Sequence, residues 1–536
     1  MKKIMVKTPT QVITEKMRKI TAPVKCTFVS ALLAGLVAHL YQYTNKIYNY
    51  DDLFINPEGY GTGAESGRWF LQFMGEWMND YLGNYSLPLI NGLFALLMMA
   101  FAAMLITDLF EVKDMLFAAF IGIFFTTIPT VVCMNFFMYT VAYYSIALFF
   151  SVLAGYLMIR YRKNIFVQIV AILLLACAVG TYQSYFANTV CILVLHVILL
   201  GAFSDEECSA LEIVKISVVY VLQLILSLAC YFVFNKISLA YWNVELGSYQ
   251  GIDSMGQIKL AEIPGMLYKC FFSFLWFCKN DIFQENPTSI VKIGIFVMYA
   301  VSALLVLYVL LRRKRPVGKS ILFLLALAAY PIAVFLIYVM VPRGWIYTLM
   351  TFSVVFIYVF IFVWLDRCQT EIRETRIQNW GGVMHWAVSL AACAIALIYV
   401  WYANGNYMSL QYTQYHDIAY FETLVTQIKS VEGYEDGLPL AIVGDEFQDS
   451  AHTTGSLIGA EFDLPGKKES NINAYSRWHI MIKYLGYNPQ FLWSAEVEEV
   501  ETWPEVQAMP AYPSDGSIQI INDVIVLKLS EAGTEK

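Results

Sequence analysis

The chain has 536 residues, of which 58% are hydrophobic and only 14% are Asp, Glu, Lys or Arg, whereas about 25% of an ordinary globular protein is charged. So little charge cannot cover the surface of a soluble protein, which excludes a soluble enzyme, a disordered protein and a secreted disulfide-rich scaffold. The composition therefore predicts a polytopic α-helical membrane protein.

The net charge of −7 is divided unevenly along the chain. Residues 403–536 carry 20 acidic and 7 basic side chains, a balance of −13, which leaves +6 for residues 1–402. This asymmetry predicts a membrane domain at residues 1–402, followed by a separate soluble domain at residues 403–536. It also argues against nucleic acid as a partner, because binding a phosphate backbone requires a basic face.

Eleven apolar segments approach the length of about 20 residues that a helix needs to cross a bilayer. In chain order they are centred on residues 26–43, 87–107, 115–133, 140–158, 165–181, 184–203, 213–234, 289–311, 320–341, 346–365 and 383–402. The first segment is not expected to be a cleaved signal peptide, because no small-residue cleavage site follows it.

Basic residues in the short flanks of these segments indicate the orientation of the chain, because Lys and Arg favour the cytoplasmic side. The first 25 residues carry seven of them, so we expect a cytoplasmic N-terminus. Basic clusters at residues 160–163, 312–319 and 367–376 fall on the same side, whereas the acidic loop near Asp205 indicates neither side. An odd number of spans then places residues 403–536 outside the cytoplasm.

Two loops on the outer side are too long to be simple turns, a first loop at residues 44–86 and a second at residues 235–289. The second contains an aromatic stretch at residues 266–278 that carries a lysine and is too short to span the membrane, so we expect an interfacial helix there. Both loops would face the same side as the soluble domain.

The soluble domain has the pattern of a small α/β fold. Helical periodicity occurs near residues 412–428 and 472–485, and an apolar strand is expected at residues 438–444. The last apolar stretch of the chain is expected to form two strands around Asn522-Asp523, a pair typical of tight turns.

The first outer loop holds the densest set of polar residues in the chain. Asp51 and Asp52 follow the first span, where one carboxylate could act as a general base whose pKa is raised by its neighbour. Glu65 and Arg68 follow near glycines such as Gly67, which let the backbone approach a ligand closely. The planar guanidinium of Arg68 suits a phosphate. An ordinary solvated loop, in which Asp51 or Asp52 caps a short helix, explains this spacing equally well.

Other candidate residues lie at the predicted outer ends of later spans. Tyr182 and Gln183 interrupt two apolar runs and could face a cavity, although an interfacial aromatic belt also explains the tyrosine. Asp253 in the second loop, near Tyr249, could assist a hydroxyl or bind a cation, and a simple turn is the alternative. Arg343 is expected on the outer side of the membrane, where basic residues are disfavoured. Binding of a lipid-linked phosphate would explain an arginine at this position, and so would snorkelling to lipid headgroups.

Two absences narrow the function. The spans carry almost no ionisable residues at mid-depth, where transporters and pumps usually need them. No glycine-rich phosphate loop precedes a helix on the cytoplasmic side. Chemistry at the outer face without a nucleotide requires an activated substrate that is delivered through the lipid.

In the residues predicted on the outer side, the sequence resembles the bacterial and phage O-antigen glucosyltransferases of the Gtr type. The resemblance rests on Asp51-Asp52 after the first span, Gly67-Arg68 before the second, Tyr182-Gln-Ser-Tyr185, Tyr249-Gln-Gly-Ile-Asp253 and Arg343. Those proteins are similar to the wider GT-C class of integral membrane glycosyltransferases, which use polyprenyl-phosphate sugars and place acidic residues of the first outer loop in the active site.

The resemblance implies a role for each of these residues. Asp51 or Asp52 would take the proton from an acceptor hydroxyl as its oxygen attacks the anomeric carbon. Arg68 and Arg343 would stabilise the leaving polyprenyl phosphate. The remaining candidates would bind substrate, namely Glu65, Tyr182, Gln183, Tyr249 and Asp253. Some GT-C enzymes use a divalent cation such as Mg²⁺ or Mn²⁺ and others do not, and no acidic cluster here assigns metal ligands.

The sequence thus predicts a GT-C-like membrane protein with about eleven spans and a small extracytoplasmic α/β domain, located in a bacterial inner membrane. It would transfer a sugar, in this family usually glucose, with inversion from a polyprenyl-phosphate donor to a cell-surface glycan such as O-antigen. A flippase or transporter of lipid-linked glycan intermediates is one alternative, although it predicts charges within the spans. A non-catalytic scaffold whose acidic domain binds a partner is the other.

Overall fold

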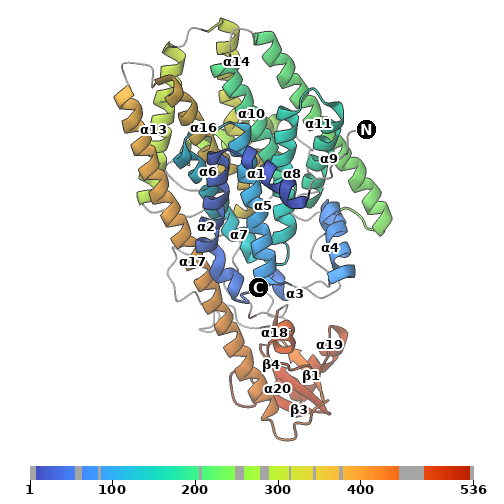
Figure 1. Cartoon of the computed structure of the whole chain (residues 1–536). Coiled ribbons are helices and arrows are strands. Elements are labelled where there is room, and N and C mark those ends of the chain that lie inside the picture. The colour runs from blue at the N-terminus through green and yellow to red at the C-terminus, as the bar shows by residue number, and fades with distance from the viewer. Residues whose placement is uncertain are drawn as a thin grey trace. The chain divides into compact units, whose positions relative to one another are not determined.

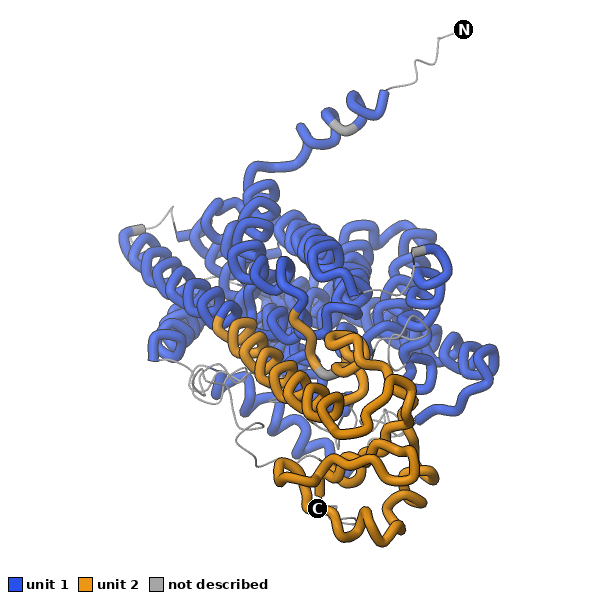
Figure 2. Tube along the Cα trace, turned by 90° about the horizontal axis from the view of Figure 1, so that it is seen from below, with its two compact units in different colours: residues 1–46, 56–404, 463–466 blue, residues 47–55, 405–462, 467–536 orange. Residues whose placement is uncertain are grey.

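The computed structural model describes residues 8–54, 63–82, 86–204, 208–247, 259–277, 289–312, 315–341, 346–372, 378–445, 472 and 476–530. The chain forms two compact units, which Figure 2 shows in different colours. Unit 1 comprises residues 1–46, 56–404 and 463–466, and unit 2 comprises residues 47–55, 405–462 and 467–536.

Unit 1 is a bundle of long apolar helices (Figure 1). Its longer helical segments are α2 (Ala22–Thr44), α5 (Pro88–Leu109), α6 (Met115–Thr127) together with α7 (Pro129–Phe136), α8 (Val141–Arg160), α9 (Ile165–Thr181), α10 (Phe186–Phe203), α11 (Ala210–Trp242), α13 (Ser289–Arg312), α14 (Val317–Val334), α16 (Val355–Ile372) and the first part of α17 (Gln378–Lys429). Shorter helices are α1 (Pro9–Lys19), α4 (Trp69–Leu82), α12 (Ile263–Trp276) and α15 (Ile337–Met340).

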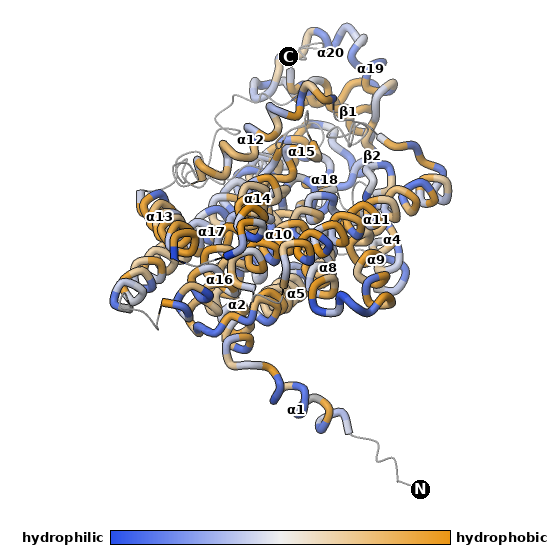
Figure 3. Tube along the Cα trace, turned by 90° about the horizontal axis from the view of Figure 1, so that it is seen from above, coloured by the Kyte–Doolittle hydropathy of each residue, from blue (hydrophilic) through white to orange (hydrophobic). Residues whose placement is uncertain are grey.

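The helices confirm a multi-pass membrane protein. Within the described chain, ten helices are long and apolar enough to cross a membrane, and α9 is a shorter apolar helix of 17 residues. Every apolar segment predicted from the sequence is mainly helical in the structure. Large apolar side chains along α11 and α13 are exposed, including Leu222, Val233 and Phe296. Figure 3 shows that both helices are mostly hydrophobic along their length. In a bilayer, such side chains contact lipid and need no protein partner.

Two predicted spans late in the membrane domain are interrupted, as is the one at residues 115–133, which α6 and α7 form. The span predicted at residues 320–341 ends as α14 at Val334, because Pro331 removes a backbone donor inside the helix. The Ser353 hydroxyl donates to the Val334 carbonyl (2.7 Å) and so satisfies this helix end. The next predicted span, at residues 346–365, begins with 3₁₀ turns at Thr348–Met350 and Phe352–Val354 before α16 starts.

The core of unit 1 is built around α6 and α16, which are its most buried spans. The rings of Phe124 and Tyr358 stack with centroids 4.1 Å apart, and those of Phe360 and Trp364 stack at 5.8 Å. Asp114 caps α6 by accepting hydrogen bonds from two backbone amides of its first turn. Aromatic stacking and a satisfied helix start together stabilise this part of the bundle.

Unit 2 contains a four-stranded sheet in the order β2-β1-β4-β3, formed by β1 (Pro439–Val443), β2 (Gln490–Phe491), β3 (Ile518–Ile521) and β4 (Val524–Lys528). β1 pairs in parallel with β2 and β4, whereas β3 and β4 form an antiparallel hairpin. Asn522 and Asp523 turn this hairpin with φ values of 50° and 60°, as a two-residue turn of this kind requires. The structure confirms the predicted strands at residues 438–444 and around Asn522-Asp523.

Helices cover both faces of this sheet. They are the last part of α17, α18 (Arg477–Lys483), α19 (Ala495–Glu501), α20 (Pro504–Ala508) and the short α3 (Tyr50–Phe54). Leu440 and Ile442 of β1 belong to the core shared with α17 and α18, whereas Ala441 and Val443 pack with residues of α19 and α20. This alternation follows from the two-residue period of a strand, and it gives the small α/β fold that we expect.

The helix predicted near residues 412–428 is confirmed, but it is the end of α17 and is continuous with the last apolar span. No proline interrupts residues 378–429, so the helix continues beyond the apolar segment at residues 383–402. The boundary between the two units falls inside this helix, after Asn404.

Candidate active site

A sharp corner at the end of α9 positions Tyr182 and Gln183. The helix ends at Thr181, Tyr182 is extended (φ −153°, ψ 110°), and a 3₁₀ turn at Gln183–Tyr185 leads into α10. A Cβ atom on Gly180 would lie 2.5 Å from the Trp69 ring, so the glycine lets the start of α4 approach the end of α9.

The first outer loop contacts this corner through its backbone. Gly67 adopts a left-handed conformation (φ 68°) after a 3₁₀ turn at Ala64–Ser66. The Tyr231 hydroxyl of α11 donates to the Gly67 carbonyl (3.1 Å), and the Gln183 amide donates to the Ser66 carbonyl (3.0 Å). Three segments far apart in the sequence thus meet at Gly67.

Arg68 is held by tyrosines. Its guanidinium carbon lies 5.3 Å from the centroid of the Tyr182 ring, and its Nη1 donates to the Tyr144 hydroxyl (3.4 Å). The rings of Tyr144 and Tyr182 are 4.8 Å apart, and both are buried. Cation–π contact of this kind orients a guanidinium, and arginine remains charged at any physiological pH.

Glu65 lies three residues before Arg68 and is exposed. Its backbone carbonyl accepts a hydrogen bond from the Gly247 amide (2.8 Å), which ties the second outer loop to the first. In unit 1 the structure therefore brings together four residues predicted for the site, namely Glu65, Arg68, Tyr182 and Gln183.

Asp51 and Asp52 lie in unit 2, on the short helix α3. The Asn49 side chain accepts a hydrogen bond from the Asp52 amide (3.0 Å), and both carboxylates are partly exposed. α3 is fixed by a hydrogen bond from Lys483 of α18 to the Leu53 carbonyl. Both aspartates thus belong to the same unit as the sheet, whereas Arg68 belongs to unit 1.

The negative charge of Asp52 affects the hydroxyl of a neighbouring tyrosine, Tyr484. Burial, together with the negative charge of Asp52, raises the pKa of Tyr484 on the turn after α18. The Tyr484 ring lies 4.9 Å from that of Tyr48, and Tyr48 donates its backbone N–H to the Gln414 side chain (3.3 Å). The segment before the aspartates is therefore packed against the helices of unit 2.

Three further predicted residues, Tyr249, Asp253 and Arg343, lie outside the described residues. Sequence reasoning also missed Tyr144 and Tyr231, because a tyrosine inside an apolar run looks like a span residue. A signal was available on α11, where the polar residues Gln223, Ser227, Tyr231, Asn235 and Ser238 recur every three or four positions and are buried. This spacing indicates one helix face.

The site combines a fixed positive charge, a side-chain amide and an exposed carboxylate at one corner of a membrane bundle. Such a combination can bind a phosphate and hydrogen-bond a sugar. Among the described residues, no three or more His, Cys, Asp or Glu side chains gather in a way that could hold a metal ion.

A family model described as Glucosyl transferase GtrII matches residues 40–358, which is more than half of the chain. The chain belongs to this family. No curated protein and no solved structure matches it. Membership confirms the resemblance to Gtr-type glucosyltransferases, is consistent with the GT-C class, and makes the protein a membrane glucosyltransferase.

The region matched by the GtrII family model contains every site residue named above, Asp51 and Asp52 included. It ends within α16, before α17 and the sheet of unit 2. The region shared with this glucosyl transferase family therefore covers most of the helical bundle and α3 of unit 2, but not the sheet.

Proposed function

We propose that this GtrII glucosyl transferase moves glucose from a polyprenyl-phosphate carrier to a cell-surface glycan such as O-antigen, at the outer face of a bacterial inner membrane. The observation that carries the proposal is the tyrosine-held Arg68 at a polar corner of the bundle. Arg68 follows the predicted first span and lies beside Tyr182, at the predicted outer end of the fifth.

Arg68 would stabilise the donor phosphate as it leaves. Negative charge develops on the phosphate oxygen while its bond to the anomeric carbon breaks, and a guanidinium oriented in advance stabilises that charge without reorganising. Tyr144 and Tyr182 supply the orientation. Because the Tyr182 ring is buried beneath the guanidinium, we assign it a positioning role rather than direct contact with the sugar.

Asp51 or Asp52 would be the base. The carboxylate takes the proton of an acceptor hydroxyl, the hydroxyl oxygen bonds to the anomeric carbon, and the phosphate leaves with the electrons of the broken bond. One displacement inverts the configuration of the anomeric carbon. Partial exposure and an anchored backbone are what a base needs to meet a substrate from solution.

The remaining predicted residues complete the proposal. Arg343 would be a second phosphate ligand, and Glu65, Gln183, Tyr249 and Asp253 would bind sugar hydroxyls. The N-terminus would be cytoplasmic and unit 2 extracytoplasmic. A flippase of lipid-linked intermediates is less well supported, because the matching family is a transferase family.

The test is glucose transfer by purified full-length protein with polyprenyl-phosphate glucose and O-antigen acceptors. Asp51→Asn and Asp52→Asn are compared with Asp515→Asn, which removes an exposed carboxylate from a turn of unit 2. Loss of the base is expected to lower kcat by about 10²–10⁴-fold in one of the two variants. Unchanged turnover in both, and in the double variant, would remove the base assignment.

Arg68 is tested in the same assay. Arg68→Gln is expected to lower kcat by about 10²–10³-fold, as the loss of one donor to a developing anion does. Arg68→Lys keeps the charge but not the planar fork, so its kcat should lie between that of the wild type and that of Arg68→Gln. Arg312→Gln, which removes an exposed charge at the end of α13, is the matched control. Wild-type kinetics of Arg68→Gln would contradict a role in donor binding.

A further inference from the structure

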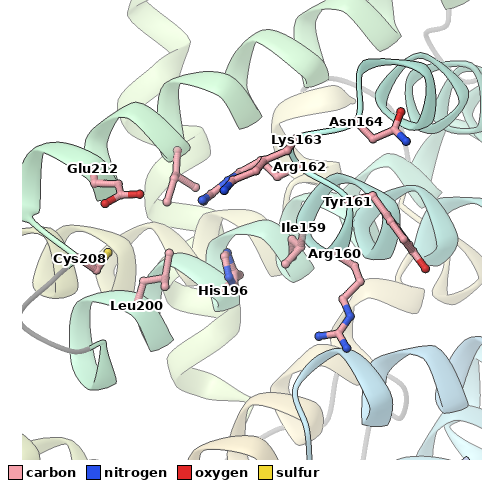
Figure 4. A pocket seen from close by; sticks show the side chains of 11 residues that line it. Ile159, Arg160, Tyr161, Arg162, Lys163, Asn164, His196, Leu200, Cys208 and Glu212 are labelled. Carbon is pink, nitrogen blue, oxygen red and sulfur yellow. The ribbon is translucent and has the colours of Figure 1, made fainter. Parts of the chain in front are cut away.

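A polar pocket lies at the opposite end of α9 from Tyr182. Its volume is about 690 Å³, and it is lined by the turn between α8 and α9, by α10 and by the start of α11 (Figure 4). With 17 residues and a rise of about 1.5 Å per residue, α9 separates the two places by roughly 25 Å. None of the candidate active-site residues lines this pocket.

The pocket carries more positive than negative charge. Arg162 and Lys163 line it, and neither forms an ion pair with a described carboxylate. Arg160 also lines it, but its Nη1 lies 3.8 Å from Glu111, and Figure 4 shows its guanidinium directed away from His196. Glu212 is the one carboxylate among the lining residues of the described chain.

Two helix N-termini add to this positive potential. α9 begins beside the pocket with Asn164 as its cap, and α11 begins there with Ser209 as its cap. The backbone amides of a first helical turn carry partial positive charge and favour an anion. The basic side chains and the helix starts thus surround one volume.

Apolar groups border the same volume. Ile159, Leu200 and Ile216 line it, and the adjoining first turns of α9 and α11 expose Phe166 (77%) and Leu211 (63%). In a membrane protein, side chains this exposed and this apolar contact acyl chains. A ligand that fits therefore combines an anionic head with hydrocarbon chains.

We propose that this pocket binds the phosphate of an anionic lipid headgroup, in the leaflet on the predicted cytoplasmic side. Free phosphate shares the charge but would leave the neighbouring apolar turns without a partner in the ligand. A bound lipid would link the α8–α9 turn to α10 and α11, the helices that lead to Gln183 and Tyr231.

The acidic segment at residues 205–207 precedes Cys208, a lining residue, and lies outside the described residues. If its three carboxylates neutralise Arg162 and Lys163, the protein will bind an anionic lipid no more tightly than a zwitterionic one, and that result overturns the proposal.

The test is native mass spectrometry of full-length protein in a neutral detergent, titrated with phosphatidylglycerol or phosphatidylcholine. Wild type is expected to bind phosphatidylglycerol more tightly. Arg162→Gln/Lys163→Gln should weaken that binding roughly 25-fold, because each basic residue near an anionic lipid contributes about fivefold. Lys16→Gln/Arg312→Gln removes two exposed charges on the same predicted side and should leave it unchanged.

A charge-conserving variant, Arg162→Lys/Lys163→Arg, separates charge from folding and is expected to retain tight binding. Equal affinity for the two lipids, or unchanged affinity in the Gln double variant, would overturn the proposal. So would inorganic phosphate that displaces phosphatidylglycerol at equal concentration, because the lipid chains would then contribute nothing. None of these readouts depends on glucose transfer.

Discussion

At the scale of single residues, Gly67 determines where Arg68 lies. Its φ of 68° is in the left-handed region, and a Cβ there would lie 2.5 Å from the Tyr231 hydroxyl. Gly67→Ala should therefore cost about 1–2 kcal/mol for the backbone alone, shift the loop, and lower kcat/KM for glucose transfer. Gly265→Ala is the control, because a Cβ at Gly265 in α12 meets nothing within 4 Å. Equal kinetics of the two variants would show that the loop does not depend on this contact.

Tyr182 and Arg68 form a pair whose coupling can be measured. Tyr182→Leu keeps an apolar side chain but removes the ring under the guanidinium, so kcat for glucose transfer should fall several-fold, as the loss of about 0.5–1 kcal/mol of cation–π energy implies. In an Arg68→Gln background the same substitution should change kcat no further. Additive effects in this double-mutant cycle would mean that the ring acts on something other than Arg68.

His479 gives unit 2 a defined response to pH. Burial, together with the positive charge of Lys483, lowers the pKa of His479 to about 4, whereas an exposed histidine titrates near 6.5. Between these values the unfolded state binds more protons than the folded state, so stability is lost as pH falls below 6.5. At pH 5 the loss is on the order of 1–2 kcal/mol.

The measurement is hydrogen exchange of α18 in full-length protein at pH 7 and pH 5, corrected for intrinsic rates. Wild type should lose protection at pH 5. His479→Gln removes the titrating group and should show equal protection at both values. A variant that keeps the full pH response would assign it to another group.

At the scale of elements, two glutamines join α9 to α11. The Gln223 amide donates to the Gln168 side-chain oxygen (2.5 Å), and the Gln168 amide donates to the Leu157 and Tyr161 carbonyls at the end of α8. Both side chains are buried. Because apolar surroundings offer no substitute partner, Gln168→Leu should lower the free energy of unfolding by about 1–2 kcal/mol.

A cycle with Gln223→Leu tests whether the two glutamines act together. The coupling energy between Gln168→Leu and Gln223→Leu, measured by unfolding in mixed detergent, should be about 0.6 kcal/mol. Zero coupling would show that the glutamines stabilise the bundle independently.

The elements also show how far the sequence determines the fold. Apolar length alone predicts the spans, since a bilayer leaves the backbone of such a segment few alternatives to a helix. Asn522-Asp523 predicts the hairpin because few residue pairs adopt two positive φ values. The absence of proline allows α17 to continue through residues 412–428, and Pro331 weakens α14 near Val334, but neither local signal fixes where these helices end, because the ends also depend on neighbouring segments.

The candidate site is predictable to a similar degree. Arg68, Tyr182 and Gln183 can be recognised because polar residues at the ends of apolar runs are conspicuous. Tyr144 cannot, because helix packing decides which face of a span is buried, whereas the spacing of the polar residues on α11 is a signal for Tyr231. Neither pattern nor spacing shows that Asp51 and Asp52 pack with unit 2, since α3 is fixed by residues more than 350 positions away.

At the scale of the whole molecule, α9 decides the side on which unit 2 lies. Ten longer helices place the two ends of the membrane domain on the same side, whereas an eleventh span places them on opposite sides. At 17 residues, α9 is at the lower limit of about 17–25 residues for a spanning helix. Charge favours spanning, because Arg162 and Lys163 precede α9 and the polar corner at Tyr182 follows it.

Labelling of introduced cysteines with a membrane-impermeant maleimide in intact spheroplasts tests this topology. Tyr81→Cys in the first outer loop and Asp515→Cys in unit 2 should both react, because eleven spans place them outside. Met17→Cys in α1 should react only after permeabilisation, and the unmodified protein corrects for its own cysteines. If the Tyr81→Cys variant is labelled and the Asp515→Cys variant is not, α9 does not span the membrane. Residues 405–536 would then lie in the cytoplasm while Asp51 and Asp52 lie outside with Tyr81, which would contradict the grouping of residues 47–55 and 405–536 in one compact unit.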